Sequence, residues 1–262
     1  MGHQIDVFGA PTEKDDRAVV LHRHPEIAGS GGYCSSAFAV ASVGVANFAP
    51  LVIGATGGSG TRVIARIAKL AGYNLGTKLN SAEDSLAFYS FHETWINPFV
   101  SARRRGQALT PWQSARMKED FHAALASHIP EAERRGARWG WKTPRSIYLL
   151  SFLHAQFAQL KFIHVMRDGR DMALSQNQNQ LRKHGRAVLS WRDRVFGSMP
   201  ERSVLLWEKV NSQAADYGET GLRESYLRVR FEDLCAKPLR RPPRFSTFWK
   251  RRLIPNRSRG RK

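Results

Sequence analysis

The sequence predicts an α/β layered fold in which helices flank a mainly parallel sheet. Apolar runs at 51–53 and 161–166 have the composition of buried parallel strands. Each run is followed by a segment whose apolar residues recur at helical spacing. Strands that alternate with helices in this way are typical of a parallel sheet covered on both faces.

The first strand leads through a glycine-rich turn into a helix. Leu51, Val52 and Ile53 precede the turn, and the expected helix runs from about 62 to 71 with Gly72 as its stop. One face of that helix carries apolar side chains, and the other carries basic ones. The turn is therefore expected between the carboxyl end of a buried strand and the N-terminus of a helix.

The later elements follow the same pattern. A short strand at 139–142 precedes a helix expected from Pro144 to about Gln159, because proline suits the first turn of a helix. Another helix follows the strand at 161–166, and a further one is expected at 201–216. Alternation of Leu227, Val229 and Phe231 with arginines predicts a half-exposed strand.

Composition and charge limit the class of protein. Apolar residues make up 42% of the 262-residue chain and charged residues 24%, as in a soluble globular protein. Two cysteines exclude a disulfide framework and a four-cysteine zinc site. The net charge is +19, but residues 240–262 hold ten basic residues and no acidic ones. The rest of the chain is moderately basic, which predicts a polyanionic ligand.

Three regions are expected along the chain. Residues 1–48 form a poorly ordered or small-residue extension, 49–238 form the domain, and 239–262 form a basic, disordered tail that resembles a truncation or a shifted reading frame. The charge-free run at 37–55 is almost long enough to span a bilayer, but Asn47 and Pro50 interrupt it. We therefore expect a cytoplasmic protein, with membrane association as the less favoured alternative.

The glycine-rich turn has the features of a phosphate-binding site. Glycines allow backbone N–H groups to approach an oxyanion, and the following helix contributes its positive end. A nucleoside-triphosphatase loop would need lysine after the last glycine, where this chain has threonine. No metal is expected to be required. The candidate phosphate-binding residues are Gly57, Gly58, Ser59, Gly60, Thr61 and Arg62.

A second anion-binding pattern follows the strand at 161–166. Arg167 begins the run Arg-Asp-Gly-Arg-Asp, and Ser175 lies eight residues on. Together with Ser59-Gly60-Thr61 this resembles the sulfotransferases that use 3′-phosphoadenylyl sulfate (PAPS). The likeness, to bacterial, tyrosylprotein and heparan-type members, runs from about Pro50 to Pro238. It implies a P-loop-like three-layer fold.

The resemblance also implies roles for these residues. The loop would hold the 5′-phosphosulfate, and Arg167 and Ser175 the 3′-phosphate. Lys142, in a Lys-x-Pro segment typical of the family, would neutralise charge on the transferred group. The chain departs from many relatives at Gly58, where they carry Lys or Arg, and Arg62 partly compensates.

The general base and the acceptor remain open at this point. Glu83 and Asp84 are the first candidates for the base, and His92 is the second. The acceptor is a hydroxyl of a carbohydrate, a lipid-linked molecule or a tyrosine. Aromatic side chains at 88–112 are either pocket surface or core. Alternatives are a nucleotide-binding protein without full activity, a small-molecule kinase, or a nucleic-acid-binding protein; specific nucleic-acid binding is not expected.

Overall fold

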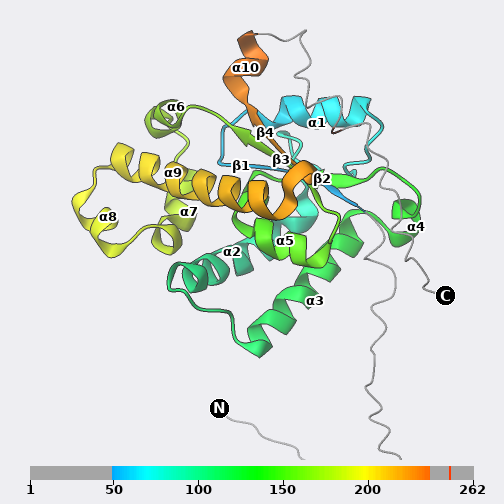
Figure 1. Ribbon diagram of the computed structural model, residues 1–262, viewed down its shortest axis with the longest axis horizontal. Helices are drawn as coiled ribbons and strands as arrows, with labels where there is room; N and C mark the ends of the chain where they lie inside the picture. The colour runs from blue at the N-terminus through cyan, green and yellow to red at the C-terminus, as the bar shows by residue number, and fades with distance from the viewer. Residues whose placement is uncertain (1–48, 237–247, 249–262) are drawn as a thin grey trace, which may run out of the picture. The chain divides into compact units, whose positions relative to one another are not determined.

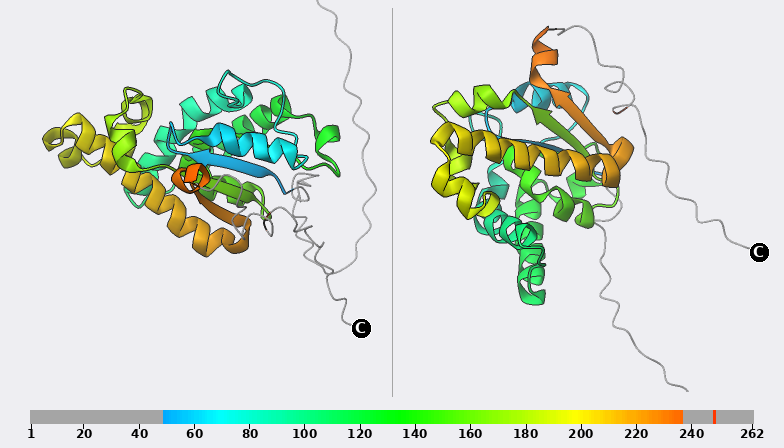
Figure 2. Two further views of the ribbon diagram at one scale, coloured as in Figure 1. Left: turned by 90° about the horizontal axis from the view of Figure 1, so that it is seen from above. Right: turned by 60° about the vertical axis from the view of Figure 1, so that its left-hand side comes forward.

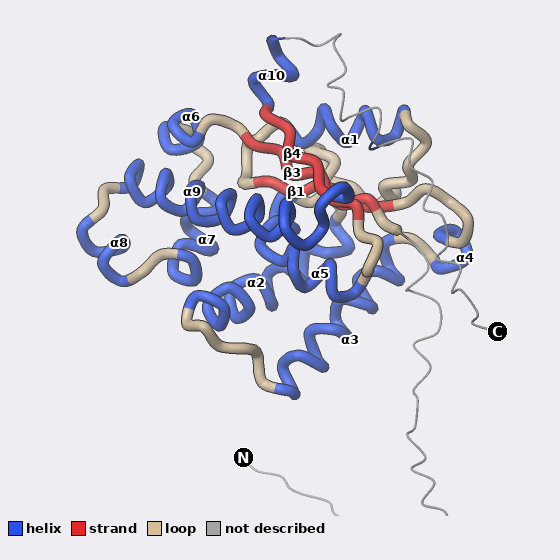
Figure 3. Tube along the Cα trace, viewed as in Figure 1, coloured by secondary structure: helices blue, strands red, loops and turns tan. Residues whose placement is uncertain are grey.

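The structure is a computed structural model that describes residues 49–236 and Phe248. Its centre is one four-stranded sheet in the order β2-β1-β3-β4. All three strand pairings are parallel, as the sequence predicts. Figure 1 and Figure 3 show the strands side by side with helices around them. The strands are β1 (Leu51–Ala55), β2 (Gly140–Lys142), β3 (Lys161–Met166) and β4 (Tyr226–Arg230).

Helices cover both faces of this sheet. The helices of the described residues are α1 (Thr61–Leu70), α2 (Tyr89–Arg104), α3 (Pro111–His128), α4 (Glu131–Arg134), α5 (Leu150–Gln156), α6 (Gly169–Leu174), α7 (Asn179–Val188), α8 (Trp191–Phe196), α9 (Met199–Tyr217) and α10 (Phe231–Ala236). Short 3-10 and π turns are η1 (Leu86–Phe88), η2 (Pro144–Leu149), η3 (Gly218–Leu222) and η4 (Arg223–Ser225). The three-layer α/β fold predicted from the sequence is confirmed.

One face of the sheet packs against α1. Alternate residues of β1, including Leu51 and Ile53, point to this side and contact Ile64 and Ala65 of the helix within one buried cluster. Phe248 belongs to the same cluster, although it lies far along the chain from the rest. Its carbonyl oxygen accepts a hydrogen bond from Lys161 Nζ at 3.4 Å, and Lys161 lies at the start of β3.

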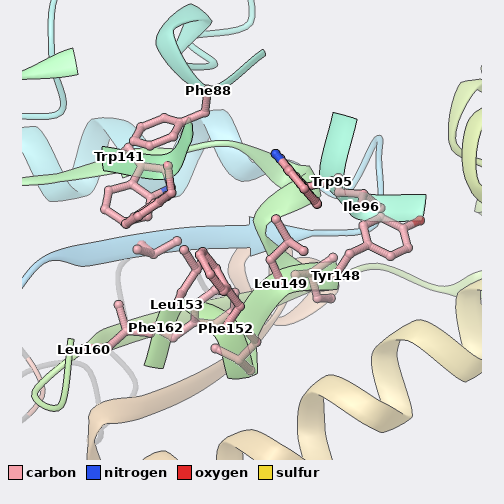
Figure 4. Packing of buried hydrophobic residues seen from close by; sticks show 14 of the residues in the cluster. Phe88, Trp95, Ile96, Trp141, Tyr148, Leu149, Phe152, Leu153, Leu160 and Phe162 are labelled. Carbon is pink, nitrogen blue, oxygen red and sulfur yellow. The ribbon is translucent and has the colours of Figure 1, made fainter. Parts of the chain in front are cut away.

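The other face supports the larger core. Val52 and Phe162 point to this side and pack with side chains of α2, α3, α5, α7 and α9. Much of this cluster is aromatic: the Phe88 and Trp141 rings lie 4.8 Å apart between centroids, as Figure 4 illustrates. Aromatic burial of this extent contributes strongly to stability. The two views of Figure 2 show α1 and α9 on opposite sides of the sheet.

Element boundaries differ most from the sequence prediction around Pro144. The single helix expected to reach Gln159 is instead the 3-10 segment η2 followed by α5, which ends at Gln156. The predicted strands agree with β1–β4 to within a residue or two at each end.

Among the described residues, no helix is long and apolar enough to cross a membrane. The run at 37–55 falls mostly outside the described residues.

Candidate active site

The glycine-rich loop joins β1 to α1 at the carboxyl edge of the sheet. Gly58 and Gly60 adopt positive φ angles of 80° and 76°. The Ser59 hydroxyl donates a 2.5 Å hydrogen bond to the Thr56 carbonyl oxygen, which holds the loop closed. No side chain caps α1, and its first turn holds no acidic residue. The positive end of the helix is therefore available for an anion.

A pocket of about 670 Å³ opens over this loop. Its lining comes from the loop, from residues before and at the start of α2, from the end of β2, from α6 and α7, and from α9 and Phe231. Its volume falls within the usual range for small-molecule sites. Four lining residues are cationic and one is acidic: Arg62, Lys142, Arg145 and Lys183, with Asp84. The pocket therefore favours an anionic ligand.

Lys142 is the last residue of β2 and is 2% exposed. Its ammonium donates to Asp84 Oδ1 at 2.5 Å and to the Ala82 carbonyl oxygen at 2.6 Å. The Ser85 N–H donates in turn to the Lys142 carbonyl oxygen at 2.9 Å. A buried lysine is tolerated only when its charge is paired in this way. The segment before η1 therefore fixes the ammonium group beside the loop.

The two neighbouring carboxylates take different positions. Glu83 has a positive φ of 64°, and its side chain pairs with Arg66 and Lys69 on α1 at 3.2 and 3.0 Å. The hydrogen bond from Lys69 lowers the pKa of Glu83 most strongly. Asp84 instead lines the pocket and contacts Lys142. Asn80 holds this arrangement, since its Oδ1 accepts from the Ala82 and Asp84 N–H groups.

His92, the second candidate for the base, is buried in the core and does not line the pocket. Burial lowers the pKa of His92 to about 3, so its ring is neutral at physiological pH. His164 is also buried, between Tyr226 and Asn211, and burial lowers its pKa to about 4. Neither histidine is placed to take a proton from a molecule in the pocket.

Arg167 and Ser175 lie outside the pocket lining. Arg167 Nη1 donates to the Gly58 carbonyl oxygen at 3.3 Å, and its guanidinium also pairs with Asp171. It therefore braces the outer side of the loop. Ser175 is exposed, and its hydroxyl oxygen accepts a hydrogen bond from the Asn177 N–H. It is the C-cap of α6, which ends at Leu174.

The pocket wall also holds an ion-pair cluster that the sequence did not predict. The guanidinium of Arg145 and the ammonium of Lys183 share Glu93 Oε1, at 2.6 and 2.5 Å. Both cations lie over the Tyr89 ring, 5.2 and 5.3 Å from its centroid. Burial raises the pKa of Glu93, but hydrogen bonds from Lys183 and Arg145 outweigh it and lower the pKa. The position of Arg145 directly after Lys142-Thr143-Pro144 was the available signal.

The aromatic residues of this region divide between pocket and core. Tyr89 lines the pocket, whereas Trp112 is 73% exposed on α3. Phe99 lines a separate, smaller pocket among α2, α3 and α5. The others that the sequence singles out are buried in the large core: Phe88, Phe91 and Trp95.

Among the described residues, no group of three or more histidine, cysteine or carboxylate side chains could hold a metal ion.

Comparison with known proteins identifies the family. The chain matches the family model described as the sulfotransferase family over residues 50–242. Because this match covers well over half of the chain, the chain belongs to the sulfotransferase family. The family resemblance drawn from the sequence is thus confirmed. No curated protein matches the chain.

Several solved structures are similar to the chain at low identity. A sulfotransferase from Mycobacterium tuberculosis H37Rv is 15% identical with a TM-score of 0.43; the match covers 74% of this chain and 65% of that one, just under two thirds. A sulfotransferase from Alicyclobacillus acidocaldarius is 14% identical with a TM-score of 0.41, over 72% and 76% of the two chains. The sulfotransferase domain from the Curacin biosynthetic pathway is 15% identical with a TM-score of 0.39, over 73% and 70%.

Proposed function

We propose that this sulfotransferase moves a sulfuryl group from PAPS to an acceptor hydroxyl and releases 3′-phosphoadenosine 5′-phosphate (PAP). The observation that carries the proposal is the ion pair between buried Lys142 and partly exposed Asp84, which lies in the pocket beside an uncapped helix N-terminus. A cation, a carboxylate and free backbone donors are the groups that such a transfer requires. A carbohydrate, a lipid-linked molecule and a tyrosine remain the candidate acceptors.

The proposed reaction assigns one task to each group. The acceptor oxygen attacks sulfur as the bond from sulfur to the bridging phosphate oxygen breaks, and the acceptor proton passes to Asp84. The loop N–H groups and Arg62 hold the phosphosulfate at the start of α1. Lys142 neutralises the negative charge that grows on the leaving phosphate. In-line placement and charge neutralisation are the same demands that phosphoryl transfer makes.

Arg167 and Ser175 are proposed, from the resemblance, to hold the 3′-phosphate. Arg167 is tied to the loop through the Gly58 carbonyl, so it lies close to the proposed 5′ site. Its pairing with Asp171 would have to exchange for phosphate, and both side chains are accessible at this surface. A charge-assisted contact between guanidinium and phosphate is strong enough to replace an exposed carboxylate pair.

The neighbouring carboxylates provide a matched test of the base. Asp84→Asn and Lys142→Ala should lower turnover about 10²–10⁴-fold, the usual range for loss of a proton-transfer or charge-stabilising group. Glu83→Gln should change turnover by less than about threefold, because its exposed pair on α1 contributes little. The measurement is PAP released from PAPS with a panel of hydroxyl acceptors.

Binding must be measured separately from turnover. Calorimetry with PAP should show that Asp84→Asn still binds nucleotide, which distinguishes loss of the base from loss of the fold. Full turnover in Asp84→Asn, or a loss in Glu83→Gln as large as in Asp84→Asn, would contradict the assignment. Nucleotide binding by the unaltered chain without turnover on any acceptor would support the alternative, a binding protein that has lost activity.

A further inference from the structure

Helix α8 presents an apolar surface that the core does not use. None of its six residues is buried. Trp191, Val195 and Phe196 are 58%, 66% and 76% exposed, and Met199 at the start of α9 is 46% exposed. Figure 1 shows α8 at the end of the helical layer, between α7 and α9. Large apolar side chains exposed together mark an interaction surface.

These side chains form one face of the helix. The Trp191 and Phe196 rings lie 6.2 Å apart between centroids, and the Arg192 guanidinium lies 5.6 Å from the Trp191 ring centroid. The Asp193 carboxylate accepts a hydrogen bond from the Ser190 N–H and pairs with Lys209, while the Asp193 N–H donates to the Ser190 hydroxyl. The outward face of α8 is therefore aromatic and cationic.

The surrounding charge is also positive. From Arg182 to Arg202 the sequence holds six basic residues and two acidic ones. The two carboxylates, Asp193 and Glu201, are both engaged in the capping boxes that begin α8 and α9. Their negative charge is therefore held at helix N-termini, while Arg192 is exposed next to the aromatic rings.

We propose that the outward face of α8 binds the surface of an anionic lipid bilayer. Tryptophan and phenylalanine next to arginine are the side chains that enter the boundary between headgroups and acyl chains. Basic residues close to the headgroups are attracted further by anionic lipid. The exposed Arg192 beside the Trp191 ring gives this apolar face the charge that complements an anionic bilayer, which is the partner that we assign to it.

Binding in this way would place the pocket close to the lipid. Helix α8 joins α7 to α9, and both of these helices contribute to the pocket wall through Leu181, Lys183 and Trp207. A bilayer in contact with α8 would therefore lie near one side of the pocket. The proposal concerns the surface alone and stands independently of the reaction proposed above.

Vesicle binding by the full chain tests the proposal. The variant Trp191→Ser/Phe196→Ser is compared with Trp112→Ser/Leu70→Ser, which removes two side chains of similar type that are exposed elsewhere. Sedimentation uses phosphatidylcholine vesicles with and without phosphatidylglycerol. The α8 variant should bind anionic vesicles at least about tenfold more weakly than the control, because it loses both apolar anchors. Thermal unfolding should be the same for both variants, since neither alters a buried residue.

Three results would overturn the proposal. The first is equal vesicle binding by the two variants, which would assign binding to other basic segments such as 240–262. The second is the absence of binding by the unaltered chain to anionic vesicles. The third is a change of oligomeric state on gel filtration in the α8 variant with unchanged vesicle binding, which would make the face a protein contact. Quenching of tryptophan fluorescence by brominated lipid in the unaltered chain, reduced in Trp191→Ser, would support it.

Discussion

At the scale of single residues, one backbone angle gives the Glu83 and Asp84 carboxylates different partners. The positive φ of Glu83 turns its side chain toward α1, while Asp84 faces Lys142. A non-glycine residue in this conformation is strained, and the Asn80 side chain holds the turn that imposes it. The sequence identified both carboxylates as candidates but could not choose between them, because the choice depends on this turn.

Four histidines of the described residues are buried with lowered pKa values, and three of them are shifted strongly enough to give a predictable response to acid. Burial is the main cause that lowers the pKa of His92 to about 3 and those of His164 and His184 to about 4. The unfolded chain therefore binds protons that the folded chain does not. The free energy of unfolding should fall as pH drops from about 6.5 toward 4, by about 1.4 kcal/mol per pH unit for each histidine.

Urea unfolding at about pH 7.5 and about pH 5 measures this loss, which integrates the proton uptake between the two conditions. In His92→Gln the unfolded chain should take up about one proton fewer than in the unaltered protein, because the substituted side chain does not titrate. The free energy of unfolding should therefore depend less steeply on pH. Ring-proton NMR signals of the three histidines should stay constant across this range in the folded protein. Titration of the His92 signal near its ordinary pKa would contradict the burial argument.

At the scale of elements, the buried runs and the alternating strand were predictable because periodicity records which face is buried. The break of η2 into α5 was not, since Leu149 and Leu150 suit either helical form and tertiary packing decides between them. Lys142 was found through the family motif. Its carboxylate partner, Asp84, lies 58 residues away, and no local pattern marks such a contact.

The two left-handed glycines of the loop should differ in their tolerance of a side chain. A Cβ at Gly60 would lie 2.2 Å from the Phe231 ring, whereas one at Gly58 would meet only Met172 at 3.4 Å and beyond. Gly58→Ala should cost about 1 kcal/mol from backbone strain alone. Gly60→Ala should cost clearly more, because the ring must also move.

Urea unfolding of the two variants provides the measurement, with nucleotide affinity as a second readout. Gly60→Ala should also weaken PAP binding more than Gly58→Ala, since a shifted loop misplaces its N–H groups. Equal stability of the two variants would show that Phe231 yields freely and does not constrain the loop.

At the scale of the whole molecule, Phe248 tests where the folded domain ends. The sequence predicts a domain that stops at 238, yet Phe248 is 6% exposed and packs with α1 and the sheet. Phe248→Ala should lower the free energy of unfolding by about 3 kcal/mol, as for other core phenylalanines. Phe196→Ala, at an exposed site, is the matched control and should change it by less than about 0.5 kcal/mol.

Chemical unfolding of both variants at neutral pH decides the matter. A loss near zero for Phe248→Ala would mean that its contacts are dispensable and that the domain can end at 238. A loss of the expected size would make at least part of the basic C-terminal segment necessary for the fold. The boundary at 238 stays a prediction until that measurement, and the residues around Phe248 lie outside the described part of the chain.

The lack of buried side chains in α8 has a consequence for how related chains can differ. The helix begins at the Ser190 capping box, the Ser198 capping box begins α9 directly after it, and none of the α8 side chains is buried in the core. Substitutions on that face therefore leave folding nearly unchanged. Related chains can therefore differ on this surface without any change in the pocket over the glycine-rich loop.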